Sequence, residues 1–179
     1  MVSFLKKAVL STSVIMACLM AAATHATEEG LEAPAFTLPG VRDVDSEITL
    51  GDLRGQIVYV DFWASWCAPC LRSLPEINTL YEKYKDQGFT VVAITIDDPV
   101  EDALDFLDDL ETPLAYHVVL DQTAEVMDAY GVVGMPTSFL IGRDGIIRKV
   151  HKGFRAGDTE LLEQALIGVL AERSGSVGE

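Results

Sequence analysis

The sequence contains few cysteines, too few for a structural framework of disulfides. Of 179 residues only three are cysteine: Cys18 in an apolar N-terminal run, and Cys67 and Cys70 three positions apart. A small domain held together by disulfides needs several cysteine pairs spread along its chain. A single closely spaced pair provides no such framework. Cys67 and Cys70 are therefore predicted to carry chemistry rather than structure.

Basic residues are also few, which excludes one class of partner. The chain has 13 Lys and Arg against 28 Asp and Glu, a net charge of −15. A surface of this charge repels nucleic acid and anionic lipid. We therefore expect no nucleic-acid partner.

The first 26 residues are predicted to be a signal peptide, with export to the periplasm or another exported compartment. Lys6 and Lys7 precede an uncharged run of 16 residues, 8–23, which ends in small residues before Ala26. That run is shorter than the ~20 residues of a usual spanning helix, which favours cleavage near Ala26 over a retained anchor. Lipidation at Cys18 stays open, because residues 15–18 loosely resemble a lipoprotein box.

Removal of residues 1–26 leaves 11 Lys and Arg against 28 Asp and Glu, a net charge of −17. The remainder is expected to form one domain over residues 27–173, followed by a disordered tail at 174–179.

Hydrophobic spacing predicts strands that alternate with helices. Strands are expected at residues 36–38, 47–50, 57–63, 89–96, 117–120, 137–141 and 146–150, and helices at 67–85, 100–110, 123–130 and 159–172. The first two strands read as an N-terminal hairpin, and the last two as a hairpin through a tight turn at residues 142–145. This order predicts an α/β fold with a mixed central sheet flanked by helices.

Cys67 and Cys70 follow a buried strand and open a helix, as a redox dithiol does. Cysteines three apart on a helical turn can close a disulfide, and the unpaired N–H groups at the helix start stabilise a thiolate. Cys67 is predicted to be the exposed attacking thiolate, and Cys70 to resolve the mixed disulfide. A zinc half-site is the alternative, with His117 and His151 as weak further ligands.

Asp61 is the exception in the otherwise apolar strand 57–63. Burial of a carboxyl disfavours its charged form, so the pKa of Asp61 should be raised and its carboxyl could exchange a proton with Cys70. The alternative is an ordinary hydrogen-bonded aspartate at a strand end.

Four landmarks resemble a known family. Residues Val60 to Cys70 resemble the thioredoxin active-site segment, and Pro75 matches the kinking proline of its helix. Gly134 to Thr137 resemble the cis-proline loop, and Gly153 matches a glycine near the active site. More narrowly, the chain resembles the exported TlpA/ResA-type branch. Residues 33–38 and 50–55 are similar to its N-terminal extension, and residues 100–120 to its central helix-strand insertion.

The resemblance implies a thioredoxin-like fold and reversible dithiol/disulfide exchange, usually in the reducing direction. It implies substrates among cysteine-containing exported proteins, apocytochromes c included, and electrons from a membrane thiol donor of DsbD/CcdA type. The protein is expected to be a monomer and to need no cofactor beyond the redox-active Cys67–Cys70 pair. The predicted substrate-binding residues are Trp66, Ala68, Pro69, Met135 and Pro136, the last with a cis peptide bond.

The sequence departs from the family pattern at two places. Ser73 stands where TlpA/ResA-type proteins commonly have a glutamate, and Ala93 where thioredoxin has a lysine beside its aspartate. A specific role in cytochrome c maturation therefore stays open. Two other functions remain as alternatives: a thiol peroxidase, whose Ser or Thr three residues before the reactive cysteine is missing here, and a metal or haem chaperone that uses the same thiols.

Overall fold

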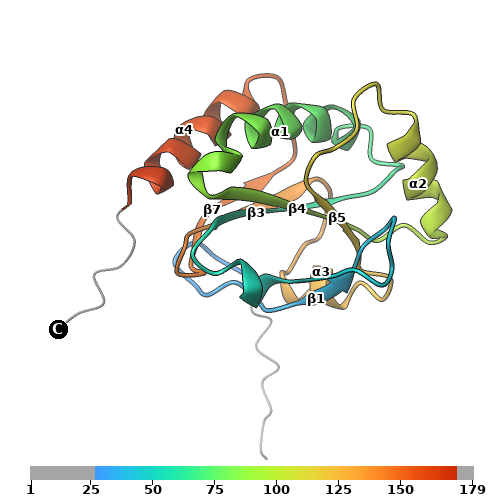
Figure 1. The fold of residues 1–179 in the computed structure, drawn as a ribbon, viewed down its shortest axis with the longest axis horizontal. Helices are drawn as coiled ribbons and strands as arrows, with labels where there is room; N and C mark the ends of the chain where they lie inside the picture. Colours follow the sequence, from blue (N-terminus) through green and yellow to red (C-terminus); the bar gives the residue numbers. More distant parts are fainter. Residues whose placement is uncertain (1–26, 173–179) are drawn as a thin grey trace, which may run out of the picture.

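The computed structural model describes residues 27–172 (Figure 1). The expected signal peptide, Cys18 and the expected tail at 174–179 lie outside the described residues, so their boundaries stay predictions. The strands are β1 (Thr37–Pro39), β2 (Glu47–Thr49), β3 (Ile57–Trp63), β4 (Phe89–Thr95), β5 (His117–Leu120), β6 (Thr137–Ile141) and β7 (Ile147–Lys152). The helices are α1 (Cys70–Tyr84), α2 (Val100–Asp108), α3 (Glu125–Ala129) and α4 (Asp158–Ala171), with 3₁₀ turns at Leu50–Leu53 and Lys85–Gln87.

A five-stranded mixed sheet forms the centre of the fold, in the order β5-β4-β3-β6-β7. β3 runs parallel to β4, and β4 to β5, whereas β6 and β7 are antiparallel to their neighbours. Every residue of β3 and β4 is buried, which explains their nearly continuous apolar runs. The predicted α/β fold, with an N-terminal hairpin and a helix-strand insertion of α2 and β5, is confirmed.

The two faces of the sheet bury separate apolar clusters. α1 and α4 lie together over one face, and α3 and β1 lie over the other (Figure 1). Successive residues of β3 face opposite sides of the sheet. Tyr59 and Trp63 join the cluster under α1 and α4, whereas Val60 and Phe62 join the cluster on the other face. The first cluster also contains Cys67 and Cys70.

The N-terminal segment contacts both outer strands of the sheet. Its beginning pairs with β7, where Gly30 N donates to Ile147 O (2.8 Å). Its end pairs with β5, where Val41 N donates to Val118 O (3.0 Å). Between these points Phe36 and other apolar side chains pack into the cluster on the α3 face. We call residues 30–41 the strap.

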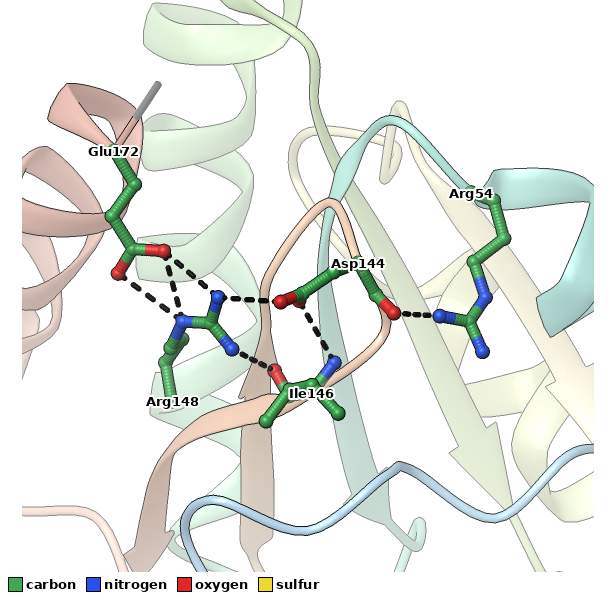
Figure 2. Close-up of polar contacts among 5 residues, drawn as sticks. All are labelled: Arg54, Asp144, Ile146, Arg148 and Glu172. Atoms are coloured by element: carbon green, nitrogen blue, oxygen red, sulfur yellow. Dashed lines mark hydrogen bonds and ion pairs between the residues drawn. The ribbon is translucent and has the colours of Figure 1, made fainter. Parts of the chain in front are cut away.

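An ion-pair network fixes the end of α4 to the turn before β7 (Figure 2). The Arg148 guanidinium donates to both carboxylate oxygens of Glu172 (3.2 and 2.9 Å), to Asp144 Oδ2 (2.9 Å) and to Ile146 O (3.1 Å). Arg54 donates to the carbonyl oxygen of Asp144 from the other side. This network therefore holds a segment that the sequence predicted only as a tight turn.

Three helices are shorter than predicted, and one of them, α2, ends at Asp108 rather than at residue 110. α1 begins at Cys70 rather than at Cys67, because the residues before it form a turn in which Cys70 N donates to Cys67 O (2.9 Å). α3 covers only Glu125–Ala129, and Ala124 before it has a left-handed backbone (φ 56°), which cannot continue a helix.

Candidate active site

Cys67 and Cys70 form a disulfide at the amino end of α1, with their Cα atoms 5.3 Å apart. The pair follows β3 directly, as expected. Cys67 is less exposed than predicted: 4% of its surface is accessible, against 0% for Cys70. Its side chain packs into the cluster with Trp63 and Ala64, and Trp66 carries the exposure instead. Cys67 remains the more accessible of the two sulfur-bearing residues.

The loop that carries Cys67 is anchored by a buried aspartate just beyond β4. Asp97 accepts hydrogen bonds from Ser65 N (2.9 Å), Ser65 Oγ (2.9 Å) and Thr95 Oγ1 (2.7 Å). Only 3% of Asp97 is exposed. The carboxylate therefore joins the end of one parallel strand to the turn that follows its neighbour, two residues before Cys67.

Asp61 lies inside the core, and its environment is that of a perturbed acid. It is 1% exposed, and its Oδ2 atom has no hydrogen-bond partner among the described residues. Burial raises the pKa of Asp61 to about 8. Asp61 lies between Tyr59 and Trp63 in β3, on the same sheet face as these two residues and both cysteines. The alternative of a hydrogen-bonded aspartate at a strand end is wrong.

The two departures from the family pattern have structural counterparts. Ser73 is buried, and its hydroxyl donates to Cys70 O within α1 (3.2 Å), so it supplies no titratable group. Ala93 is the direct partner of Asp61 in the parallel pairing of β3 with β4. Asp61 thus has no cation at the neighbouring position, which leaves burial as the cause of its raised pKa.

The loop before β6 lies at the same end of the sheet as the cysteines, because Thr137 pairs with Phe62 near the end of β3. The Met135–Pro136 bond is cis, as expected from the resemblance, and the Asp98–Pro99 bond, for which nothing was predicted, is cis as well. Gly153 N donates to Pro136 O (2.8 Å), and Met135 packs against the cluster that contains the disulfide.

Apolar side chains are exposed around this end of the molecule. Trp66 is 68% exposed and Val133, in the cis-proline loop, is 93% exposed. Ala68 is exposed and Pro69 is half-buried. Trp63, by contrast, is fully buried and packs on Phe106 with ring centroids 5.3 Å apart. Apolar surface is therefore exposed on the cysteine loop and on the cis-proline loop.

The two histidines among residues 27–172, His117 and His151, take no part in this apolar surface. His151 Nε2 lies 3.1 Å from Asp158 Oδ2, and burial lowers the pKa of His117. Within residues 27–172 no group of three or more His, Cys, Asp or Glu is placed to hold a metal ion. In the same part of the chain no helix is long and apolar enough to cross a membrane.

Comparison with known proteins decides between the remaining activities. A family model described as Redoxin matches residues 28–166, well over half of the chain. The chain belongs to the redoxin family.

Curated relatives of this redoxin are thiol-disulfide oxidoreductases. ResA of Bacillus thuringiensis subsp. konkukian (strain 97-27) is 37% identical over 127 residues, which are 70% of each chain. ResA of Geobacillus thermodenitrificans (strain NG80-2) is 35% identical over 124 residues, 69% of each chain. A solved structure assigned as thiol:disulfide interchange protein DsbE from Chlorobium tepidum is 44% identical, with a TM-score of 0.75, covering 80% of this chain and 99% of that one.

These matches confirm the TlpA/ResA-type resemblance and the thioredoxin-like fold. The redoxin is an enzyme, a thiol-disulfide oxidoreductase, and its Cys67–Cys70 disulfide has the spacing that this activity uses. The names of these relatives favour thiol-disulfide exchange over the alternatives of a thiol peroxidase and a metal or haem chaperone.

Sequence reasoning missed three polar residues of the site. Asp97 carried a signal, since it follows a strand end, but its partner Ser65 could not be known without the fold. Ser138 and Tyr59 gave only weak signals, as polar side chains in otherwise apolar strands. Their hydrogen bond, Tyr59 Oη to Ser138 Oγ at 2.6 Å, depends on the pairing of β3 with β6.

Proposed function

We propose that this redoxin reduces disulfides in cysteine-containing exported proteins, with Cys67 as the attacking thiolate and Cys70 as the resolving thiol. One observation carries the assignment of roles. Cys67 is the more accessible cysteine and stands next to the exposed Trp66, whereas Cys70 is fully buried on the sheet face that also holds Asp61. A substrate disulfide can therefore approach Cys67 more readily than Cys70.

The exchange proceeds in two balanced steps. In the first, the Cys67 thiolate attacks a substrate disulfide, a Cys67–substrate bond forms, and one substrate sulfur leaves as a thiolate. In the second, Cys70 attacks Cys67, the Cys67–Cys70 bond forms, and the other substrate sulfur leaves. Two electrons pass from the protein dithiol to the substrate.

The second step needs a base, because Cys70 must lose its proton before its sulfur attacks. We assign this role to the Asp61 carboxylate, which lies on the same sheet face and whose raised pKa of about 8 suits proton exchange with a thiol. Trp66, Ala68, Pro69, Met135 and Pro136 are proposed to contact the substrate, through apolar surface at Trp66 and backbone pairing at Met135.

Trapping tests the two cysteine roles. In a Cys70→Ser variant the mixed disulfide on Cys67 cannot be resolved, so substrates should accumulate covalently and be released by dithiothreitol. The matched Cys67→Ser variant should trap none. Accumulation on Cys70 in the Cys67→Ser protein would reverse the roles.

The reduction potential of the Cys67–Cys70 couple tests the direction. A value near the ~−270 mV of thioredoxin supports a reductant, whereas a value near the ~−120 mV of DsbA would make the protein an oxidant. Equilibration with glutathione or dithiothreitol buffers gives this value directly.

Export and partners complete the proposal. Residues 1–26 are proposed to direct the chain to the periplasm or an equivalent exported compartment, where a membrane thiol donor of DsbD/CcdA type would reduce it again. The protein is proposed to act as a monomer, with its disulfide as the only redox group. Cell fractionation and N-terminal sequencing of the mature protein distinguish cleavage near Ala26 from retention or from lipidation at Cys18.

A further inference from the structure

A row of polar side chains crosses the sheet beneath α4. Asp61 in β3 lies directly opposite Ser138 in β6, and Ser138 lies directly opposite His151 in β7. Directly paired residues of antiparallel strands project from the same face, with Cβ atoms roughly 4.5–5.5 Å apart. Exposure rises along the row, from 1% for Asp61 and 3% for Ser138 to 30% for the His151 side chain. The row therefore leads from the buried carboxyl toward solvent.

Two polar atoms of this row have hydrogen-bonding capacity that the structure leaves unused. Tyr59 Oη donates to Ser138 Oγ at 2.6 Å. Burial and the neighbouring Asp61 raise the pKa of Tyr59 well above its ordinary value, so Tyr59 stays protonated and remains the donor. The proton of the Ser138 hydroxyl is then left to point elsewhere. Asp61 Oδ2, on the directly paired residue, is a buried acceptor to which no described residue donates, Ser138 included, so the two side chains are neighbours without a hydrogen bond between them.

A cavity reaches the Ser138 hydroxyl from outside. It has a volume of about 270 Å³ and lies between α4 and the strands, lined by residues that include Tyr59, Ser138, His151 and Ala165. This volume holds several waters at roughly 30 Å³ each. Asp61 does not line the cavity. Ser138 therefore stands between the carboxyl and the water-accessible space.

Turnover creates a need for such a route. Each resolving step places one proton on Asp61, and that proton must leave before the next cycle. On the side of the disulfide, Cys67 is 4% exposed and Cys70 is fully buried. The cysteine face therefore offers the carboxyl little contact with water.

We propose that Ser138 relays protons between Asp61 and water in the cavity beneath α4. Because the two side chains are not hydrogen-bonded to each other in the oxidised structure, the release step begins with their rotation toward each other. Ser138 Oγ then accepts the proton of the Asp61 carboxylic acid and passes its own hydroxyl proton to water. Asp61 is left as a carboxylate, Ser138 is unchanged, and one proton has reached solvent. This inference rests on the proposed role of Asp61 as the base for Cys70.

Several other ionisable groups lie near the row. Desolvation raises the pKa of Tyr116 as it does that of Tyr59. Both phenols already donate their protons away from Asp61, Tyr59 to Ser138 Oγ and Tyr116 to Leu74 O (3.1 Å). Ala93, on the β4 side, has no ionisable group. The remaining groups are the two cysteines at α1, Lys149 and His151 on β7, and Asp158 on α4.

The test measures proton release and disulfide chemistry in the same mixing experiment. The reduced full-length protein is mixed with a nitro-aromatic disulfide whose leaving thiolates are coloured and ionised, at a pH about one unit above the pKa of about 8 that burial gives Asp61. Asp61 is then a carboxylate at rest and takes up a proton only in the resolving step. Their colour reports the chemistry, and a pH-indicator dye in weakly buffered solution reports the proton. In the wild type the two signals should rise together.

In Ser138→Ala the proton signal should lag by about tenfold, which is below the ~100-fold or more that general acid-base catalysis contributes. Ser138→Thr keeps the hydroxyl and should restore the wild-type time course. Tyr59→Phe is the matched control, because it breaks the same 2.6 Å hydrogen bond but leaves the relay hydroxyl in place. Equal lags in Ser138→Ala and Tyr59→Phe, or no lag in either, would overturn the proposal.

Filling the cavity gives a second test that leaves Ser138 intact. Ala165→Leu places a larger side chain in the cavity from α4, and should delay proton release without slowing colour formation. Gln164→Leu adds the same side chain at an exposed position of the same helix and should change neither signal. A wild-type time course in Ala165→Leu would count against the cavity as the route.

Asp61→Asn separates this proposal from the one on which it rests. If Asp61→Asn leaves the rate of colour formation and its pH dependence unchanged, the role of Asp61 as a base is wrong. If Asp61→Asn slows colour formation while Ser138→Ala releases its proton on time, Asp61 keeps its role and only the relay is wrong.

Discussion

Burial raises the pKa of Asp61 to about 8, from an ordinary value of 3.8. Between these two values the unfolded chain ionises this carboxyl while the folded chain keeps it protonated. The unfolded state then binds fewer protons, so the free energy of unfolding falls as pH rises. The stabilisation is fully present below about pH 4 and is lost by about pH 8.

This sign can be checked by denaturant unfolding of the oxidised protein across that pH window. We expect the wild type to lose stability by several kcal/mol, since each pKa unit corresponds to about 1.4 kcal/mol. Asp61→Asn, which cannot ionise, should show a much flatter profile. A wild-type profile as flat as that of Asp61→Asn would contradict the raised pKa.

Trp66 allows a second prediction at the scale of one residue. It is 68% exposed beside the attacking cysteine, so its ring contributes little to folding and is free to contact a substrate. Trp66→Ala should raise KM for a protein disulfide by roughly tenfold, a loss of about 1.4 kcal/mol of binding. The rate with dithiothreitol should change little, and a parallel loss with both reagents would indicate a damaged site instead.

At the scale of elements, the active-site loop depends on its tie to β4. Asp97→Ala removes the acceptor of three hydrogen bonds and leaves the backbone N–H of Ser65 without its partner. The expected cost is about 1–3 kcal/mol, or a fall in Tm of roughly 2–4 °C per kcal/mol for a chain of this size. Asp97→Asn keeps one oxygen acceptor and should lose less. Calorimetry of the two variants, with insulin reduction as the activity assay, checks the order.

The elements also show what the sequence could predict and why it could not predict the rest. The strands β3 and β4 and the helix after Cys70 were predictable, because long apolar runs and helical spacing are local signals. The start of α1 was placed three residues early, since the turn at Cys67 is set by hydrogen bonds to neighbouring atoms rather than by residue type. Asp61 stood out as a charge in an apolar strand. Ser138 did not stand out, because its proposed role depends on its position opposite Asp61 in the sheet, which the sequence does not show.

At the scale of the whole molecule, net charge should govern which substrates react quickly. The chain carries −15, so it attracts basic polypeptides over a distance that shrinks from about 30 Å at 0.01 M salt to about 8 Å at 0.15 M. Two synthetic disulfide peptides, identical except for flanking lysines or glutamates, provide the test. Raising the salt concentration should slow reduction of the lysine peptide and speed that of the glutamate peptide. The same response in both would show that electrostatic attraction between protein and peptide does not control the encounter.

The strap of residues 30–41 contacts both outer strands of the central sheet, β7 at one end and β5 at the other. An outer strand with free N–H and C=O groups is a template on which another chain can add. By occupying part of each edge, the strap works against polymerisation of the folded protein.

A chain that begins after residue 41 would uncover both edges and part of the apolar cluster beneath them. We expect such a chain to form oligomers that grow with concentration in analytical ultracentrifugation, while residues 27–172 sediment as one species. A segment that takes no part in the chemistry would then be what keeps the catalyst dispersed.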